Sequence, residues 1–212
     1  GTDVTYNPVV ISYAFISEDE SVLFIDPKKI TAEASDNLKK EGVVLADYTM
    51  IQKYLSRLPE NSRVFIDPAK TNISLYNALP KGCTIIEGIT PANHLKSIKN
   101  ETEIKGFRNA TVKDGIALTR FYIWLEKAAG EKVTELDASA RLTALRAEQP
   151  QYIMDSFESI TGYAGHGAIV HYAPTPETDV ELKPESLLLM DSGAQYLDGT
   201  TDITRTVALG EP

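Results

Sequence analysis

The stretch "LLLMDSGAQYLDGTTDITRTVALG", Leu187 to Gly210, decides how the C-terminal half of the chain folds. A strand-like run of leucines opens onto three aspartates, Asp191, Asp198 and Asp202, with glycines and threonines between them. Carboxylates at the end of an apolar strand are unfavourable to bury unless a cation neutralises them. The stretch therefore predicts a hairpin that presents acidic side chains to a cation.

The composition is that of an ordinary globular protein. The 212 residues are 42% hydrophobic and 24% charged, and no apolar run approaches membrane-spanning length. The 30 acidic residues outnumber the 21 basic ones, so the net charge of −9 argues against a nucleic-acid partner. Cys83 is the only cysteine, which excludes an internal disulfide. We expect a cytoplasmic protein with neither a membrane nor a nucleic acid as partner.

Residues 1–92 alternate strand and helix patterns and predict a small α/β domain. The predicted strands are 9–17, 21–26, 42–48, 63–67 and 83–89, and the predicted helices are 31–40, 49–58 and 70–79. The segment "FIDP" occurs twice, and its Asp26 and Asp67 could form a carboxylate pair. Because Asp caps helices well and Pro suits the first helical position, we interpret both copies as strand-to-helix corners.

Residues 93–212 have a different pattern and predict an α+β domain. Apolar residues at helical spacing predict one long amphipathic helix over 101–128. Thr134 begins a second predicted helix, which ends before Pro150. Strand patterns then follow at 156–164, 167–173, 186–196 and 200–209. These strands predict an antiparallel meander.

Asp191 and Asp202 are the candidate metal ligands. If the hairpin strands pair so that these carboxylates face each other, a divalent cation is needed to relieve their repulsion. Oxygen-only ligands favour Mn²⁺ or Mg²⁺, and Zn²⁺ or Co²⁺ can also bind. A turn centred on Asp198 and Gly199 would instead place Asp202 opposite Gln195. The spacing alone leaves both registers open.

The runs "GHGAIVHYAPTPETD" and "LLLMDSGAQYLDGTTDITRTVALG" resemble those of the Xaa-Pro aminopeptidases, or aminopeptidases P. These metallopeptidases share the pita-bread fold with prolidase, methionyl aminopeptidase and creatinase. The likeness extends through "ETEIKGFRNATVKDGIALTRFYIWLE" and back to "GTDVTYNPVVISYAFI", so it covers the whole chain. It implies a creatinase N-terminal-like α/β domain, incomplete at its start, over 1–92. The first half of an α+β pita-bread catalytic domain would follow over 93–212.

The resemblance implies a metal-dependent aminopeptidase that releases the residue before a proline in second position. Asp191 and Asp202 match the first two ligands of a pair of divalent ions, with Mn²⁺ expected and Zn²⁺ or Co²⁺ as alternatives. A water shared by the ions would attack the peptide carbonyl. His171 matches the active-site histidine near the scissile bond, where it could donate a hydrogen bond or transfer a proton. The partner is then a peptide with proline at its second position, and the family's frequent dimers imply a homodimer.

The implied metal site is incomplete in this sequence. The family adds a His and two Glu from later strands, but the residues after Asp202 contain no His and only Glu211. We therefore expect an internal fragment of a longer protein that is inactive by itself. Prolidase and a non-catalytic peptide-binding pita-bread module are the alternatives.

Other polar residues near these positions have weaker claims. His166 lies in a glycine-rich loop, and we leave it out of the catalytic set. Thr201 and Thr204 flank Asp202 and are expected to hydrogen-bond its carboxylate, which would orient the ligand. Arg205 is expected to neutralise a carboxylate.

Overall fold

The computed structural model describes residues 3–211, which divide into two units. Unit 1 contains residues 9–99 together with Asp3, and unit 2 contains residues 100–211 together with Val4–Pro8. The boundary expected after residue 92 falls inside helix α4 (Pro91–Ser97), which belongs to unit 1. The acidic hairpin lies wholly within unit 2.

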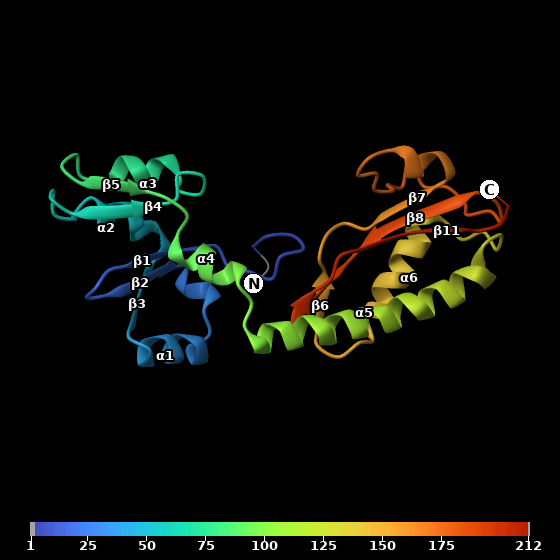
Figure 1. The fold of residues 1–212 in the computed structure, drawn as a ribbon, viewed down its shortest axis with the longest axis horizontal. Helices are drawn as coiled ribbons and strands as arrows, with labels where there is room; N and C mark the ends of the chain where they lie inside the picture. The colour runs from blue at the N-terminus through green and yellow to red at the C-terminus, as the bar shows by residue number, and fades with distance from the viewer. Residues whose placement is uncertain (1–2, 212) are drawn as a thin grey trace. The chain divides into compact units, whose positions relative to one another are not determined.

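Unit 1 is an α/β unit with two small sheets (Figure 1). Its strands are β1 (Ser12–Ile16), β2 (Ser21–Ile25), β3 (Val43–Asp47), β4 (Arg63–Ile66) and β5 (Thr84–Glu87). Its other helices are α1 (Ala32–Lys40), α2 (Ile51–Leu55) and α3 (Ile73–Ala78), with 3-10 helices η1 (Pro27–Lys29) and η2 (Tyr48–Met50). Strand β2 pairs antiparallel with β1 and parallel with β3, whereas β4 and β5 form a parallel pair. The five strands and three helices predicted for this part of the chain are confirmed.

Both copies of "FIDP" form corners after a strand. The Asp26 side chain accepts a hydrogen bond from the Lys28 backbone N–H at 2.9 Å, and Pro27 begins η1. The Asp67 side chain accepts one from the Ala69 N–H at 3.0 Å, in a turn that precedes α3. The interpretation as corners is therefore confirmed, although the second copy leads into a turn before its helix begins.

Unit 2 begins with two helices, α5 (Glu101–Ala128) and α6 (Glu135–Ala147). Each starts with a reciprocal capping box, formed by Asn100 with Glu103 and by Thr134 with Asp137. Both predicted helices are confirmed. None of the helices within residues 3–211 has the length and apolar composition that crossing a bilayer requires.

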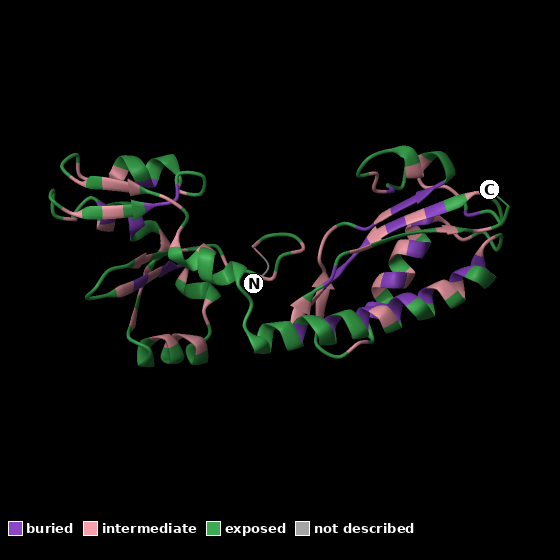
Figure 2. Cartoon of the chain, in the orientation of Figure 1, coloured by how far each residue is buried: buried purple, intermediate pink, exposed green. Residues whose placement is uncertain are grey.

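The strands of unit 2 form two antiparallel three-stranded sheets, ordered β11-β8-β7 and β10-β9-β6. They are β6 (Tyr152–Asp155), β7 (Ile160–Tyr163), β8 (Leu187–Ser192), β9 (Ala194–Tyr196), β10 (Gly199–Thr200) and β11 (Ile203–Ala208). Helices α5 and α6 lie along one side of the sheet formed by β7, β8 and β11 (Figure 1). The main core of the unit lies between them, and the buried residues of α5 follow one side of that helix (Figure 2). Its members include Phe121, Leu125, Leu142, Leu145, Leu188 and Met190.

The strand predicted at 167–173 is wrong. The 3-10 helix η3 (Ala164–Ala168) and a turn occupy this segment. Ile169 and Val170 are 54% and 83% exposed, so their high strand propensity finds no sheet partner among the described residues. The sequence patterns also missed β6, since no strand was predicted over Tyr152–Asp155. The strand predicted to begin at residue 156 begins at Ile160.

Helix α5 contains two glycines, of which one is closely packed and the other has free space around its Cα atom. A Cβ atom at Gly106 would lie 2.1 Å from the carbonyl oxygen of Asp198, so the helix and the turn of the acidic hairpin touch there. A Cβ atom at Gly115 would meet nothing within 4 Å. Close packing therefore requires glycine at the first position only.

Alanine at these two positions should change stability in opposite directions. Gly106→Ala should lower the free energy of unfolding by about 1–3 kcal/mol, because the helix or the turn must move. Gly115→Ala should raise it by roughly 0.5–1 kcal/mol, because alanine is the better helix former. Trp124, the only tryptophan, lies in α5, so its fluorescence during urea unfolding reports on unit 2. Equal effects at the two positions would contradict the contact described here.

Candidate metal centre

The register of the acidic hairpin places Asp191 and Asp202 diagonally. Asp191 pairs with Thr204 across β8 and β11, and Asp202 precedes Thr204 by two positions. The same register continues towards the turn, where Thr200 pairs with Gln195. The two aspartates are therefore not directly opposite, and Asp202 does not face Gln195 either. Both expected registers are wrong, because the turn centres on Leu197 and Asp198.

Strand alternation, extended by one residue before β11 to Asp202, assigns both carboxylates to one face of the sheet. Side chains alternate between the two faces along a strand, and directly paired residues share a face. Asp191 therefore shares its face with its partner Thr204, and with Asp202, which precedes Thr204 by two positions. Leu188 and Met190 point to the other face, where they are buried in the core against α5 and α6. The aspartates therefore project from the face that the helices leave open.

Asp191 carries a buried oxygen without a partner. Its Oδ1 atom is shielded from solvent and has no hydrogen-bond partner among residues 3–211. A buried carboxylate oxygen without a partner is costly, and a cation bound beside it would remove that cost. Oxygen donors of this kind fit a hard divalent cation.

Asp202 completes only part of a metal site. Its side chain is exposed on the same face as Asp191. Within the described part of the chain, no group of three or more His, Cys, Asp and Glu side chains could hold a metal ion. Two carboxylates can bind a cation but leave most of its coordination shell open.

His171 lies in the turn after η3 and not at a strand end. It is exposed, and its φ of 56° places it in the left-handed region that non-glycine residues rarely adopt. No hydrogen bond joins it to Asp191 or Asp202 within residues 3–211. Its catalytic role stays a prediction.

Thr201 and Arg205, both close to Asp202, have other partners. The Thr201 hydroxyl accepts a hydrogen bond from the Ala194 N–H at 3.0 Å and is buried. Arg205 donates to the backbone oxygen of its neighbour Thr204 at 2.7 Å. The expected hydrogen bond from Thr201 to the Asp202 carboxylate is therefore not formed. The Thr201 hydroxyl instead stabilises the hairpin.

Gly193 lies where the chain passes from β8 to β9. A Cβ atom there would lie 2.0 Å from the carbonyl oxygen of Thr201 and 2.3 Å from the hydroxyl oxygen of Ser156. Ser156 donates its backbone N–H to the Gly193 oxygen at 3.0 Å and its hydroxyl to the Thr201 oxygen at 2.9 Å. Only glycine allows this approach, which fixes the strand ends beside both aspartates.

A fully buried ion pair connects the helices to this junction. Arg146 of α6 donates to the two carboxylate oxygens of Asp114 in α5 at 2.7 and 3.0 Å. Its third contact is the Gly193 carbonyl oxygen at 3.3 Å. The Tyr196 hydroxyl donates to Asp114 at 3.2 Å. Burial, and then the nearby carboxylate of Asp114, raise the pKa of Tyr196.

Sequence reasoning missed this pair, although a pattern could have pointed to it. Asp114 occupies the apolar stripe of α5, between Ala110 and the buried pair Ala117 and Leu118. A charged residue at a core position of an amphipathic helix predicts a buried partner of opposite charge. The partner itself, Arg146, could not be chosen from spacing.

Asp198 has a structural partner. Its carboxylate accepts a hydrogen bond from Lys113 Nζ at 2.6 Å, and the same ammonium lies 3.2 Å from Gln151 Oε1. The side chains of this ion pair are largely shielded from solvent. The third aspartate of the stretch therefore neutralises a lysine of α5.

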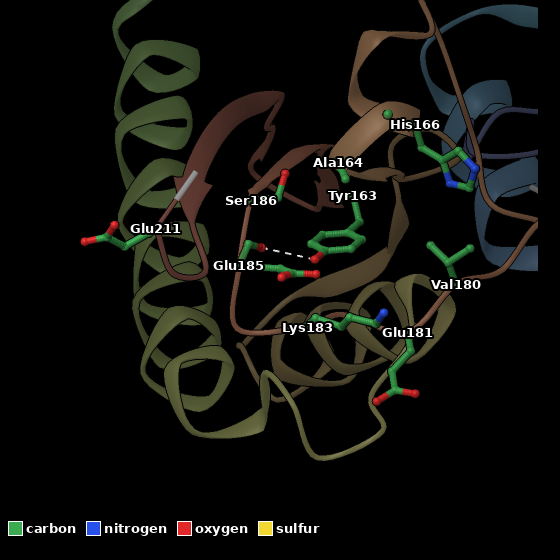
Figure 3. A pocket seen from close by; sticks show the side chains of 10 residues that line it. Tyr163, Ala164, His166, Val180, Glu181, Lys183, Glu185, Ser186 and Glu211 are labelled. Carbon is green, nitrogen blue, oxygen red and sulfur yellow. Dashed lines mark hydrogen bonds between the residues drawn. The ribbon is translucent and has the colours of Figure 1, made fainter.

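A pocket of about 570 Å³ lies beside η3 (Figure 3). His166, Lys183 and Glu185 are among the residues that line it, and the Tyr163 hydroxyl donates to the Glu185 backbone oxygen at 3.1 Å. Neither aspartate of the candidate site nor His171 lines this pocket. The pocket therefore contains none of the three candidate residues.

Comparison with protein families assigns both parts of the sequence. The Creatinase/Prolidase N-terminal domain family matches residues 1–103, and metallopeptidase family M24 matches residues 105–212. The chain belongs to metallopeptidase family M24. The predicted fold class, a creatinase N-terminal-like α/β domain followed by part of a pita-bread domain, is confirmed.

Several M24 relatives match the whole chain. Aminopeptidase P2 of Arabidopsis thaliana is 34% identical and Xaa-Pro aminopeptidase ApepP of Drosophila melanogaster 36% identical, each over 100% of this chain. The chain covers 34% and 35% of those two proteins, about a third of their length.

Solved structures show the same fold. An X-prolyl aminopeptidase from Caenorhabditis elegans, described as a cytosolic enzyme with a di-nuclear active site, matches with a TM-score of 0.93 and 30% identity. The match covers 100% of this chain and 36% of that one. An Xaa-Pro dipeptidase from Bacillus anthracis matches with a TM-score of 0.75 and 20% identity, over 97% of this chain and 57% of that one. The second likeness concerns the fold alone.

Breaking the buried ion pair should destabilise unit 2 far more than breaking an exposed one. Arg146→Met should lower the free energy of unfolding by about 3–5 kcal/mol, because Asp114 is left buried and unpaired. Arg120→Met, which removes the half-exposed pair with Glu148 on the same two helices, should change it by less than about 1 kcal/mol. Urea unfolding followed by Trp124 fluorescence measures both. Similar losses in the two variants would contradict the proposed importance of burial.

The raised pKa of Tyr196 predicts a loss of stability at high pH. Unfolding lets this phenol ionise at its usual pKa of 10.0, whereas the folded state keeps it neutral. The free energy of unfolding should therefore fall as the pH rises from about 9 to about 11, and should fall less in Tyr196→Phe. Urea unfolding at the two pH values checks this. An identical fall in both proteins would show that Tyr196 ionises normally in the folded state.

Proposed function

We propose that this chain is part of an Xaa-Pro aminopeptidase, which releases the N-terminal residue from peptides with proline in second position. Two relatives that carry this name match the whole chain at 35% and 36% identity. The observation that carries the proposal is the buried, unpartnered Oδ1 atom of Asp191 on the same open face as Asp202. A carboxylate pair arranged in this way suits a metal-dependent peptidase.

Asp191 and Asp202 would hold two divalent ions, which we propose to be Mn²⁺, with Zn²⁺ and Co²⁺ as the alternatives. When bound, such ions lower the pKa of water and stabilise negative charge on the substrate carbonyl. Asp191 would be the more rigid ligand, because it lies within β8 between two paired strands. Asp202, outside the paired strands and exposed, can adjust to the second ion.

His171 would act on the substrate itself. Its exposed ring can donate a hydrogen bond to the oxygen of the tetrahedral intermediate, or transfer a proton to the leaving amine. Ile169 and Val170, exposed beside it, offer an apolar surface next to the scissile bond.

The 212 residues by themselves should not hydrolyse peptides. Two carboxylates cannot fill the coordination shells of two ions, and the described residues supply no third ligand. We place the enzyme in the cytoplasm, in line with the cytosolic C. elegans relative, and propose that it forms a homodimer.

Substitution of the two aspartates in a full-length protein that contains this chain tests the metal site. Asp191→Asn and Asp202→Asn should each lower kcat/KM for an Xaa-Pro tripeptide by roughly a thousandfold and reduce bound Mn²⁺, because each removes a charged ligand. Asp198→Asn, on the same hairpin but paired with Lys113, is the matched control and should retain Mn²⁺. Retained metal in both site variants would contradict the ligand assignment.

Substrate length separates the proposal from its alternatives. The full-length protein with Mn²⁺ should cleave an Xaa-Pro tripeptide, and the 212-residue chain should not. Cleavage of Xaa-Pro dipeptides alone would identify a prolidase. Binding of a proline peptide without turnover would identify a non-catalytic module.

A further inference from the structure

One buried carboxylate holds the segment that carries His171. Glu135, the first residue of α6, is 0% exposed. Its carboxylate faces the ten residues from Tyr163, at the end of β7, to Tyr172. His171 lies within this segment, one position before its end.

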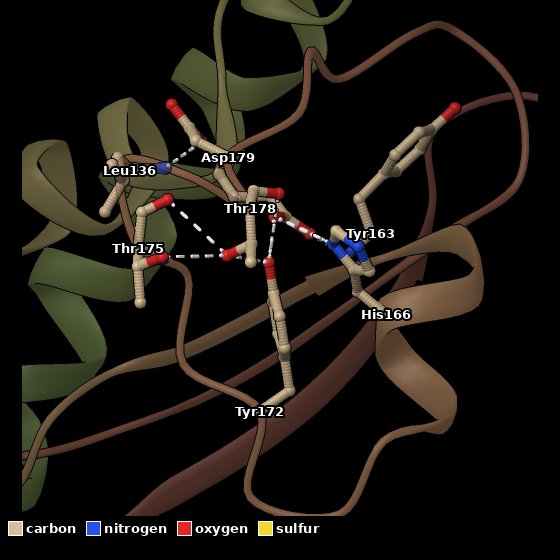
Figure 4. A network of polar contacts seen from close by, with 8 residues as sticks. Leu136, Tyr163, His166, Tyr172, Thr175, Thr178 and Asp179 are labelled. Carbon is tan, nitrogen blue, oxygen red and sulfur yellow. Dashed lines mark hydrogen bonds and ion pairs between the residues drawn. The ribbon is translucent and has the colours of Figure 1, made fainter.

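Three donors from this segment converge on the two Glu135 oxygens. Figure 4 labels the three donor residues, Tyr163, His166 and Tyr172. The Tyr163 N–H donates to Oε1 at 2.7 Å, and the Tyr172 hydroxyl donates to Oε2 at 2.8 Å. His166 Nδ1 lies 3.0 Å from each oxygen. Both ends and the middle of the segment are therefore tied to one residue of α6.

The arrangement restricts His171 through its neighbours. The rings of His166 and Tyr172 pack against each other with centroids 4.4 Å apart. His171 itself has a φ of 56°, a conformation that costs energy unless the residues on both sides enforce it. Since Tyr172 is the next residue, its hydrogen bond to Glu135 holds one side of that strained position.

A purely helix-capping role does not explain Glu135. The first turn of α6 is already capped by the Thr134–Asp137 capping box, and Asp179 accepts a hydrogen bond from the Leu136 N–H at 3.1 Å. Within the described residues, the Glu135 carboxylate accepts no hydrogen bond from its own helix. A buried charge is expensive unless several donors satisfy it, and here all the donors belong to the His171 segment.

We infer that Glu135 is a positioning residue for His171, acting through Tyr163, His166 and Tyr172. The inference rests on the proposed function, because it takes His171 to act on the substrate. Glu135 itself touches no reacting atom. It keeps the segment in the single conformation in which the imidazole is presented.

Hydrogen exchange of the 212-residue chain tests the positioning directly. Glu135→Gln keeps the shape but loses the charge and one acceptor oxygen. Exchange of the Ile169 and Tyr172 amides, which are bonded within the segment, should rise by at least about tenfold. Asp137→Ala removes the capping box two residues along the same helix and is the matched control. Its effect should be confined to α6.

A milder variant protects the test against misfolding. Tyr172→Phe removes one donor to Glu135 and should raise exchange in the same segment while β8 stays protected. Should Glu135→Gln fail to fold, this variant decides the question. Unchanged exchange of the segment, or an equal rise throughout unit 2, would overturn the inference.

Kinetics in a full-length protein separate the inference from the proposed function. Glu135→Gln should lower kcat with little change in KM, in the same direction as His171→Ala. An unaffected kcat in Glu135→Gln, with His171→Ala impaired, would overturn the positioning role. Normal kcat/KM in His171→Ala would instead refute the role of His171, whatever the exchange measurements show.

Discussion

The buried pair of Asp114 and Arg146 is the interaction on which the geometry of unit 2 depends. It joins α5 to α6, and the remaining guanidinium N–H reaches the backbone of Gly193 between two hairpin strands. A fully buried ion pair contributes little net stability. Removal of either partner is nevertheless strongly destabilising, because the other charge is then buried without a partner. Helices and hairpin can therefore pack together in only one register.

That register determines what each face of the sheet offers. The side chains of β8 alternate, so the packing of Leu188 and Met190 against the helices forces Asp191 onto the opposite face. A slip of one residue would bury Asp191 in the core and expose two apolar side chains. The position of the candidate ligand thus follows from the hydrophobic core and from the Arg146 contact at Gly193.

Local patterns in the sequence were sufficient for the helices and for most strands. Apolar spacing predicted α5, and Thr134 together with Pro150 predicted the ends of α6, because these signals lie close together in the sequence. The register of the acidic hairpin was not predictable, since it depends on the close approach at Gly193 and on a buried arginine far away in the sequence. The strand predicted at 167–173 does not form, because residues with high strand propensity adopt a strand only where a neighbouring strand can pair with them.

Asp114, Glu135 and Asp191 of unit 2 each have a carboxylate oxygen shielded from solvent, and they differ in how well these oxygens are satisfied. Asp114 and Glu135 are 0% exposed, and each accepts hydrogen bonds from several elements. Of these three acids, Asp191 is the one with a buried carboxylate oxygen that has no partner among residues 3–211. A fold that supplies donors to two buried acids can supply them to a third. A cation bound at this oxygen would supply the partner that the described residues do not, which is the role proposed for the metal.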